Sequence, residues 1–177
     1  MSQTLENVCQ QLIAGVAGMV GDVVRPRWQG PDPPNLPPYG TDWVAVGITR
    51  KRPIGIYGAT IHQNPEPGTD LMQRHEEFDL LCSFYGPNAD VYSSSLHDGL
   101  MIWQNKSELR LVGMAFVEIT EGIRVPELIK NQWTDRVDKT VILRRIIQRT
   151  YPVRNIVWAG GWINTDLPPY RAPFHAP

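Results

Sequence analysis

The sequence lacks an excess of charge of either sign and a long apolar run. Its 177 residues carry a formal net charge of −1, which argues against the basic face typical of a dedicated nucleic-acid binder. No apolar stretch is long enough to cross a bilayer. The first residues also lack the basic start and continuous apolar run of a signal peptide. We therefore expect no membrane partner and synthesis in the cytoplasm.

Cysteines are few, and Gly-rich phosphate-binding loops are missing. The two cysteines, Cys9 and Cys82, lie far apart and match no metal-binding or redox spacing. Cys9 falls in a predicted helix and Cys82 on the apolar face of a predicted strand, so both are predicted to be small buried residues in a reducing compartment. We predict no cofactor and no bound metal.

The most informative stretch runs from Gln73 to Trp103. Alternating apolar and polar residues predict a strand with one buried face, and a turn at Gly86-Pro87-Asn88 ends it. Asn88 is then predicted to cap a helix with its side chain. The packing stripe of this helix is expected to contain Tyr92, Leu96, Gly99, Leu100 and Trp103.

Other elements follow from hydrophobic periodicity. We predict a first helix that Thr4 caps and whose stripe runs from Leu5 to Val20, and a loop over 126–132. Strands are predicted over 42–50, 58–63, 114–120, 133–150 and 153–163, the last two as a hairpin. This order predicts an α+β fold, with a largely antiparallel sheet flanked by two main helices.

Proline is frequent in two segments, 26–38 and the C-terminal tail (LPPYRAPFHAP). The run from Pro26 to Pro38 (PRWQGPDPPNLPP) forbids helix and ladder pairing, so we predict a proline-rich extended arm over 26–40. Trp28 and Leu36 within it need an apolar partner, either on the same domain or on a neighbouring molecule. We expect a single domain over 1–164 and an extended C-terminal tail over 165–177.

Two groups of residues have the types that catalysis uses. His75, Glu77 and Asp79 share one strand face and could hold a divalent metal, which leaves a small metal-dependent hydrolase as an alternative. A polar outer strand face explains them better, because metal sites draw ligands from several elements. Ser94, His97 and Asp98 resemble a hydrolase triad in type, but adjacent helix positions are not expected to face each other. We predict no enzyme activity.

Arginines gather around the final strands, at Arg144, Arg145, Arg149 and Arg154. Asp135, Asp138 and the acidic central strand are available partners, so ion pairs within or between subunits are favoured over DNA binding. Long strands, proline arms and no convincing active site favour an assembly protein. A head-to-tail contact that closes on itself gives a ring.

Four long phrases resemble the tailed-bacteriophage neck or tail terminator proteins: NLPPYGTDWVAVGIT (35–49), HEEFDLLCSFYGPNAD (75–90), LHDGLMIWQNKSEL (96–109) and QWTDRVDKTVILRR (132–145). The resemblance implies a structural virion protein that forms a homo-hexameric ring at the head–tail interface. Such a ring terminates the tail tube or neck and joins it to the head-side connector. A head-completion or adaptor protein docked on the portal is the alternative.

The resemblance implies three partners besides further copies of the chain: the tail-tube or neck protein, the head-side connector or adaptor, and genomic DNA only in passage. Because a basic lining would hold DNA back, we expect acids on the lumen wall. The candidate lumen residues are Glu76, Glu77, Asp79, Glu118 and Glu121. The candidate interface residues are Trp28, Leu36, Tyr39, Trp133, Arg136, Asp138, Arg144 and Arg145.

Overall fold

The computed structural model describes residues 5–31, 35–54, 61–63, 68–152, 159–164 and 171–176. The chain forms two compact units, which we describe separately. Unit 1 contains Met1–Ala59 and Arg74–Ile147, and unit 2 contains Thr60–Gln73 and Gln148–Pro177.

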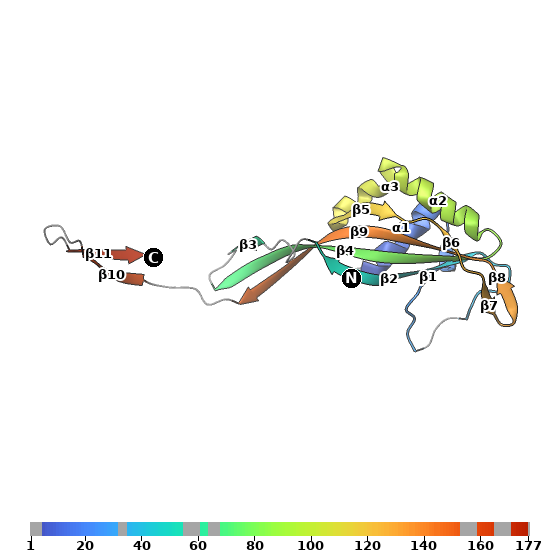
Figure 1. Ribbon diagram of the computed structural model, residues 1–177, viewed down its shortest axis with the longest axis horizontal. Coiled ribbons are helices and arrows are strands. Elements are labelled where there is room, and N and C mark those ends of the chain that lie inside the picture. The colour runs from blue at the N-terminus through green and yellow to red at the C-terminus, as the bar shows by residue number, and fades with distance from the viewer. Residues whose placement is uncertain are drawn as a thin grey trace. The chain divides into compact units, whose positions relative to one another are not determined.

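A single sheet forms the centre of unit 1 (Figure 1). Its strands are, in spatial order, β1 (Val24–Pro26), β2 (Trp43–Pro53), β4 (Thr69–Tyr85), β9 (Arg136–Pro152) and β5 (Met114–Ile119), and β6 (Ile123–Arg124) also pairs with β9. The pairs β2–β4, β5–β9 and β6–β9 are antiparallel, whereas β1 runs parallel to β2. The predicted α+β class with a largely antiparallel sheet is confirmed.

Helices cover only one face of this sheet. They are α1 (Leu5–Ala17), α2 (Ala89–Met101) and the short α3 (Trp103–Ser107), with 3₁₀ turns η1 (Gly21–Val23) and η2 (Glu108–Val112). Apolar residues of α1, α2, β2, β4 and β9 form one continuous core between the helices and the sheet. We call this side the helix-covered face and the opposite side the helix-free face. We expected two main helices, and the described residues form three α-helices.

Helix α1 confirms the predicted stripe in part: Ile13 is buried, and Leu5, Val8, Leu12 and Val16 pack partly buried against the core. Cys9 and Ala17, which the stripe did not include, are buried as well, and Val20 is 83% exposed. The helix ends at Ala17, because Gly18 adopts a left-handed backbone with φ of 71°. The stripe was expected to continue to Val20. Thr4, the predicted cap, lies outside the described residues.

Strand β4 confirms the predicted alternation: Phe78, Leu80, Cys82 and Phe84 are fully buried or nearly so. The predicted cap of α2 is wrong, because the Asn88 side chain makes no capping bond. Instead, the Asp42 carboxylate accepts hydrogen bonds from the Asn88 backbone N–H and from its side-chain amide, both at 2.8 Å. The start of α2 is therefore held by the loop before β2.

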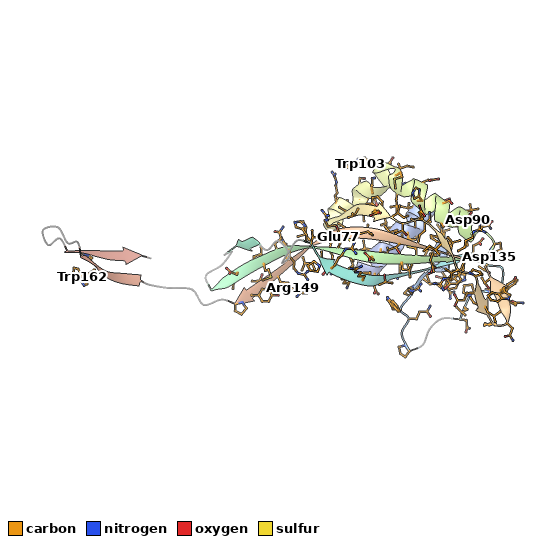
Figure 2. All side chains as sticks on the ribbon, viewed as in Figure 1. Glu77, Asp90, Trp103, Asp135, Arg149 and Trp162 are labelled. Carbon is orange, nitrogen blue, oxygen red and sulfur yellow. The ribbon has the colours of Figure 1, made fainter. Side chains whose placement is uncertain are left out.

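The end of the predicted stripe on α2 is also wrong. Leu96, Gly99 and Leu100 are buried, but Ile102 has an extended backbone with ψ of 123° and separates α2 from α3. Trp103 consequently lies on a new helix and projects to the surface, 58% exposed (Figure 2).

The loop predicted over 126–132 is in fact part of a hairpin. Strands β7 (Glu127–Ile129) and β8 (Gln132–Thr134) pair antiparallel. Lys130 and Asn131 connect them with φ angles of 49° and 63°, a two-residue turn of the type that suits hairpins. The sequence signal was weak because Lys at the first turn position is unusual.

In unit 2, β3 (Ile61–Gln63) pairs with the Leu71–Gln73 part of β4, and β10 (Ala159–Asn164) pairs with β11 (Arg171–Ala176). The hairpin predicted between 133–150 and 153–163 is therefore wrong. Residues 159–164 pair with the C-terminal segment in a separate sheet, while β9 pairs with β4 and β5.

The structure does not show the proline-rich arm over 26–40 as a separate arm. Pro26 ends β1, and the Arg27 N–H donates to the Val46 carbonyl at 2.8 Å. The extended arm and the domain limits 1–164 and 165–177 stay predictions. None of the described helices has the length and apolarity needed to span a membrane.

Candidate assembly surface

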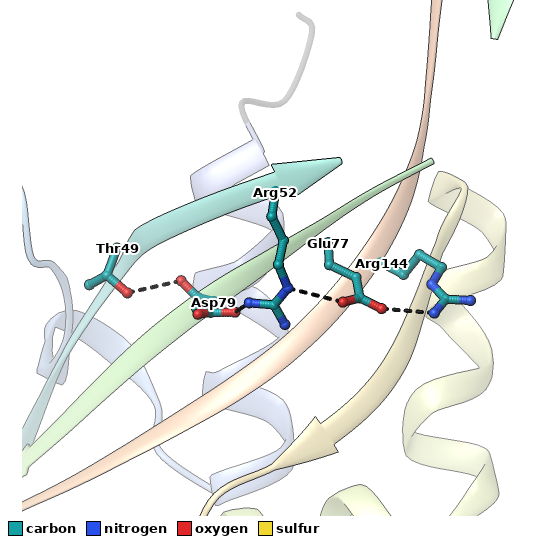
Figure 3. Close-up of polar contacts among 5 residues, drawn as sticks. All are labelled: Thr49, Arg52, Glu77, Asp79 and Arg144. Carbon is teal, nitrogen blue, oxygen red and sulfur yellow. Dashed lines mark hydrogen bonds and ion pairs between the residues drawn. The ribbon is translucent and has the colours of Figure 1, made fainter. Parts of the chain in front are cut away.

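An ion-pair ladder crosses three strands on the helix-free face (Figure 3). Arg52 of β2 donates to Asp79 Oδ1 at 2.7 Å and to Glu77 Oε2 at 3.2 Å. Arg144 of β9 donates to Glu77 Oε1 at 2.7 Å. Strand register brings these groups together, because Arg52 lies directly opposite Glu77. The hydrogen bond from Arg144 is the main reason that the pKa of Glu77 lies below its ordinary value.

A second ion pair lies at the end of the helix-covered face. Glu76 is only 6% exposed and accepts two hydrogen bonds from Arg145, at 3.0 and 2.8 Å. Arg74 contacts its other carboxylate oxygen at 3.3 Å. The predicted pairing of Arg144 and Arg145 with the acidic central strand is confirmed. Arg149 is exposed, and Arg154 lies outside the described residues.

Arg136 joins the β7–β8 hairpin to the sheet. It makes two hydrogen bonds to Asp138, at 2.8 and 2.7 Å, and one to Glu127 at 2.9 Å. The Tyr85 hydroxyl donates to the same Glu127 carboxylate, and its ring stacks on Trp43 with centroids 4.1 Å apart. Burial raises the pKa of Tyr85 to about 12. The charges of Arg136 and Asp138 are thus paired within the subunit.

The apolar candidates for the interface are exposed. Trp28 donates its indole N–H to the Ile48 carbonyl at 3.0 Å, yet 58% of the residue is exposed. The indole N–H is thus satisfied on the same domain, while the apolar ring stays exposed and is available to a neighbouring molecule. Leu36 and Tyr39 line an open cavity of about 550 Å³ together with Trp43. Trp133 is 68% exposed and lines a small pocket with Tyr39.

The five candidate lumen acids differ in their surroundings. Glu77 and Asp79 lie on the helix-free face and are bound by arginines. Glu76 is buried on the other face. Glu118 and Glu121, on and after β5, are exposed. Neither makes an ion pair within the part of the chain that the structure describes.

The residues considered for catalysis are not arranged as a site. Both carboxylates, those of Glu77 and Asp79, accept hydrogen bonds from Arg52. Among the described residues, no three His, Cys, Asp or Glu side chains lie close enough together to hold a metal ion. The expectation that His97 and Asp98 cannot face each other is wrong, since His97 Nδ1 lies 3.2 Å from Asp98 Oδ1. Both are solvent-accessible on α2, and Ser94 is exposed beside them.

Burial raises the pKa of both free thiols. The pKa of Cys9 rises to about 12, mainly by burial, and that of Cys82 rises further for the same reason. Both cysteines are buried, as predicted, and they pack in the apolar core.

Sequence reasoning missed two residues that organise this surface. Asp42 holds the start of α2, and Arg52 links the two acids of the ladder. The alternation of Arg50 and Arg52 at the end of β2 was an available signal, because it matches the alternation of Glu77 and Asp79.

Comparison with known proteins gives one finding. A family model described as phage neck terminator protein matches residues 3–166, most of the chain. No curated protein matches the chain.

Proposed function

The chain belongs to the phage neck terminator family, and on this premise we propose that identical copies form a closed ring that ends the tail tube or neck. The family consists of structural proteins rather than enzymes, so the chain has a structural role in joining head and tail as part of the virion. In the proposal, the homo-hexameric ring contacts the tail-tube or neck protein on one side. The head-side connector binds the other side.

Exposed apolar side chains on two opposite flanks of unit 1 carry the ring proposal. One flank, the β5 flank, consists of edge strand β5 with α3 and η2 beside it (Figure 1), and exposes Trp103, Leu111 and Val117. The other, the β2 flank, is the opposite edge of the sheet and exposes Trp28. Different apolar surfaces on one subunit suit a head-to-tail contact, which closes into a ring when the rotation permits.

The helix-free face has the charge balance that a DNA conduit needs. Arg52 and Arg144 are matched by Glu77 and Asp79. Phosphate affinity grows with the number of cations that contact DNA, so a balanced wall lets the genome pass. We propose that this face lines the lumen, with Glu77, Asp79, Glu118 and Glu121 on or near it. Glu76 is not included because it is buried and points to the helix-covered face.

Imaging of purified protein, alone and mixed with tail tubes, tests the ring proposal. We expect rings that cap tube ends. Leu111→Asp should abolish them without changing the unfolding midpoint, because Leu111 is 87% exposed. Val91→Asp is the matched control, since Val91 is also exposed but lies on α2 outside both flanks. Lone subunits under both conditions would contradict the proposal, and a ring directly on the portal would favour the adaptor function.

A charge variant tests the lumen proposal separately. Replacing Glu77 and Asp79 by Gln and Asn leaves Arg52 and Arg144 without acidic partners. Particles that carry this double variant should release DNA more slowly at low salt than at high salt, because phosphate contacts are screened by salt. Equal release at both salt concentrations would contradict placement of this face in the lumen.

A further inference from the structure

Both edges of the unit 1 sheet are only partly covered. Strand β5 is the last strand of the sheet on one side. On the other side, β1 pairs only with Val44–Val46 of β2. The next outward-facing carbonyl, that of Ile48, accepts a hydrogen bond from the Trp28 indole N–H. Beyond this point, no strand of the described chain pairs with the outer edge of β2, which continues to Pro53.

These two open edges lie at the same level of the sheet. Arg50 of β2 is opposite Asp79 of β4, and Glu118 of β5 is opposite Ile142 of β9. The contacts Glu76–Arg145 and Glu77–Arg144 show that β4 and β9 run antiparallel. Continuing this order by two residues places Asp79 beside Ile142. One row across the sheet therefore begins at Arg50 and ends at Glu118.

Arg50 and Glu118 share the helix-free face and carry opposite charges. Residues directly opposite each other in a sheet point to the same side, so Arg50 lies on the side of Asp79. Ile142 is an even-numbered residue of β9 like Arg144, whose side chain bonds Glu77 on that face. Both Arg50 and Glu118 are exposed, and neither makes an ion pair among the described residues.

Strand direction also permits the two edges to meet. Successive antiparallel pairs from β2 through β4 and β9 make β5 run opposite to β2. A second copy placed beside the first, with the same face towards the same side, would add its β2 antiparallel to β5. Because the edges are level, repeating this step needs no shift along the strands, which is the condition for a closed ring rather than an open helix.

We infer that the β5 edge of one copy contacts the β2 edge of the next copy, with Glu118 paired to Arg50 across the boundary. This inference rests on the proposed ring and identifies its contact. Bulges interrupt both edges, between Ile48 and Arg50 and between Phe116 and Glu118. Bulges hinder indiscriminate edge pairing, so the complementary charges select the partner edge.

Charge reversal tests this contact in the full chain. Arg50→Glu and Glu118→Arg should each weaken ring assembly about a hundredfold or more, because like charges then meet at every boundary. The double variant R50E/E118R should restore assembly. Glu6→Arg is the control: it makes the same change of charge on an exposed position of α1 and should leave rings intact.

Cross-linking gives a second readout that needs only transient contact. On oxidation, the variant R50C/E118C should form a series of disulfide-linked oligomers whose largest member contains as many subunits as the ring. The disulfides can form because directly opposed Cβ atoms are within disulfide reach. An equal mixture of the two single variants should stop at dimers. Cys9 and Cys82 are buried and do not compete.

The outcomes separate the contact from the ring itself. If the wild type and both charge-reversal variants all form rings, and R50C/E118C gives no covalent oligomers, the contact is overturned and the ring proposal stands. A wild-type protein that forms no ring, alone or on tail tubes, would overturn the proposed function as well.

Discussion

The two faces of one sheet differ in what they contribute. On the helix-covered face, β4 places Phe78, Leu80 and Phe84 in the core. On the helix-free face, the same strand places Glu77 and Asp79 against arginines of neighbouring strands. Burial of large apolar side chains is worth several kcal/mol each, whereas solvent-accessible ion pairs are worth about 1 kcal/mol or less. The helix-covered face therefore contributes most of the stability. On the helix-free face, Trp43 and Tyr85 pack under the β7–β8 hairpin, and the part that carries the ladder is available for assembly.

The largest expected effect is loss of a core side chain. Phe78→Ala should lower the free energy of unfolding by about 3–5 kcal/mol, since it leaves a cavity in a close-packed core. Urea unfolding of the purified chain measures this. Asp79→Ala, on the neighbouring position of the other face, should cost about 1 kcal/mol or less. Equal losses for the two variants would remove the distinction between the faces.

An intermediate effect is expected for the buried carboxylate. Glu76→Gln should cost about 2 kcal/mol, because Arg145 loses a charged partner in a site shielded from water. Glu77→Gln, which breaks ladder contacts on the accessible side, should cost about half as much or less. The comparison needs the two unfolding curves at the same pH. A larger cost at Glu77 would mean that the ladder holds the fold.

A smaller effect of opposite sign is expected at Lys139. This residue is 8% exposed, and burial lowers the pKa of its ammonium group. Keeping the ammonium group charged in this position therefore lowers the free energy of unfolding. Lys139→Met should raise the free energy of unfolding by about 1 kcal/mol. A loss of stability in the urea assay would show that Lys139 makes a favourable interaction with the carboxylates near it.

The smallest effect concerns pH. The pKa of Glu77 is depressed from its ordinary value of 4.5, so its contribution to stability is complete above that value and is lost as pH falls through the folded-state pKa. The difference in stability between the protein and Glu77→Gln should therefore shrink as pH falls below the ordinary value of 4.5. A difference that stays constant or grows on acidification would contradict this reading of the ladder.

Local patterns predicted much of the fold but not its exceptions. Alternation in β4 and helical spacing in α1 follow from which residues must be buried, so the core of both elements was predictable. The break at Ile102 was not, because nothing in the local spacing marks it. The pairing of β10 with β11 depends on contacts between segments and could not be derived from local periodicity.

The candidate surface was predictable in type rather than in pairing. The acidic strand and the arginines of β9 were recognised as partners, and alternation places Glu76 and Glu77 on opposite faces. The sequence could not show that Glu76 binds Arg145 and Glu77 binds Arg144, because that depends on the register of β4 with β9. Asp42 was missed because it acts on Asn88 across 46 positions of sequence. Such long-range contacts depend on the register of the sheet.

The central claim is that the helix-free face lines a ring whose copies meet edge to edge. A map of the assembled ring at side-chain resolution tests it most directly. We predict that Glu77 and Asp79 face the axis, with the helices outside and β5 of each copy beside β2 of the next. Helices α1 and α2 towards the axis, or a lumen wall dominated by unpaired Lys and Arg, would contradict this account.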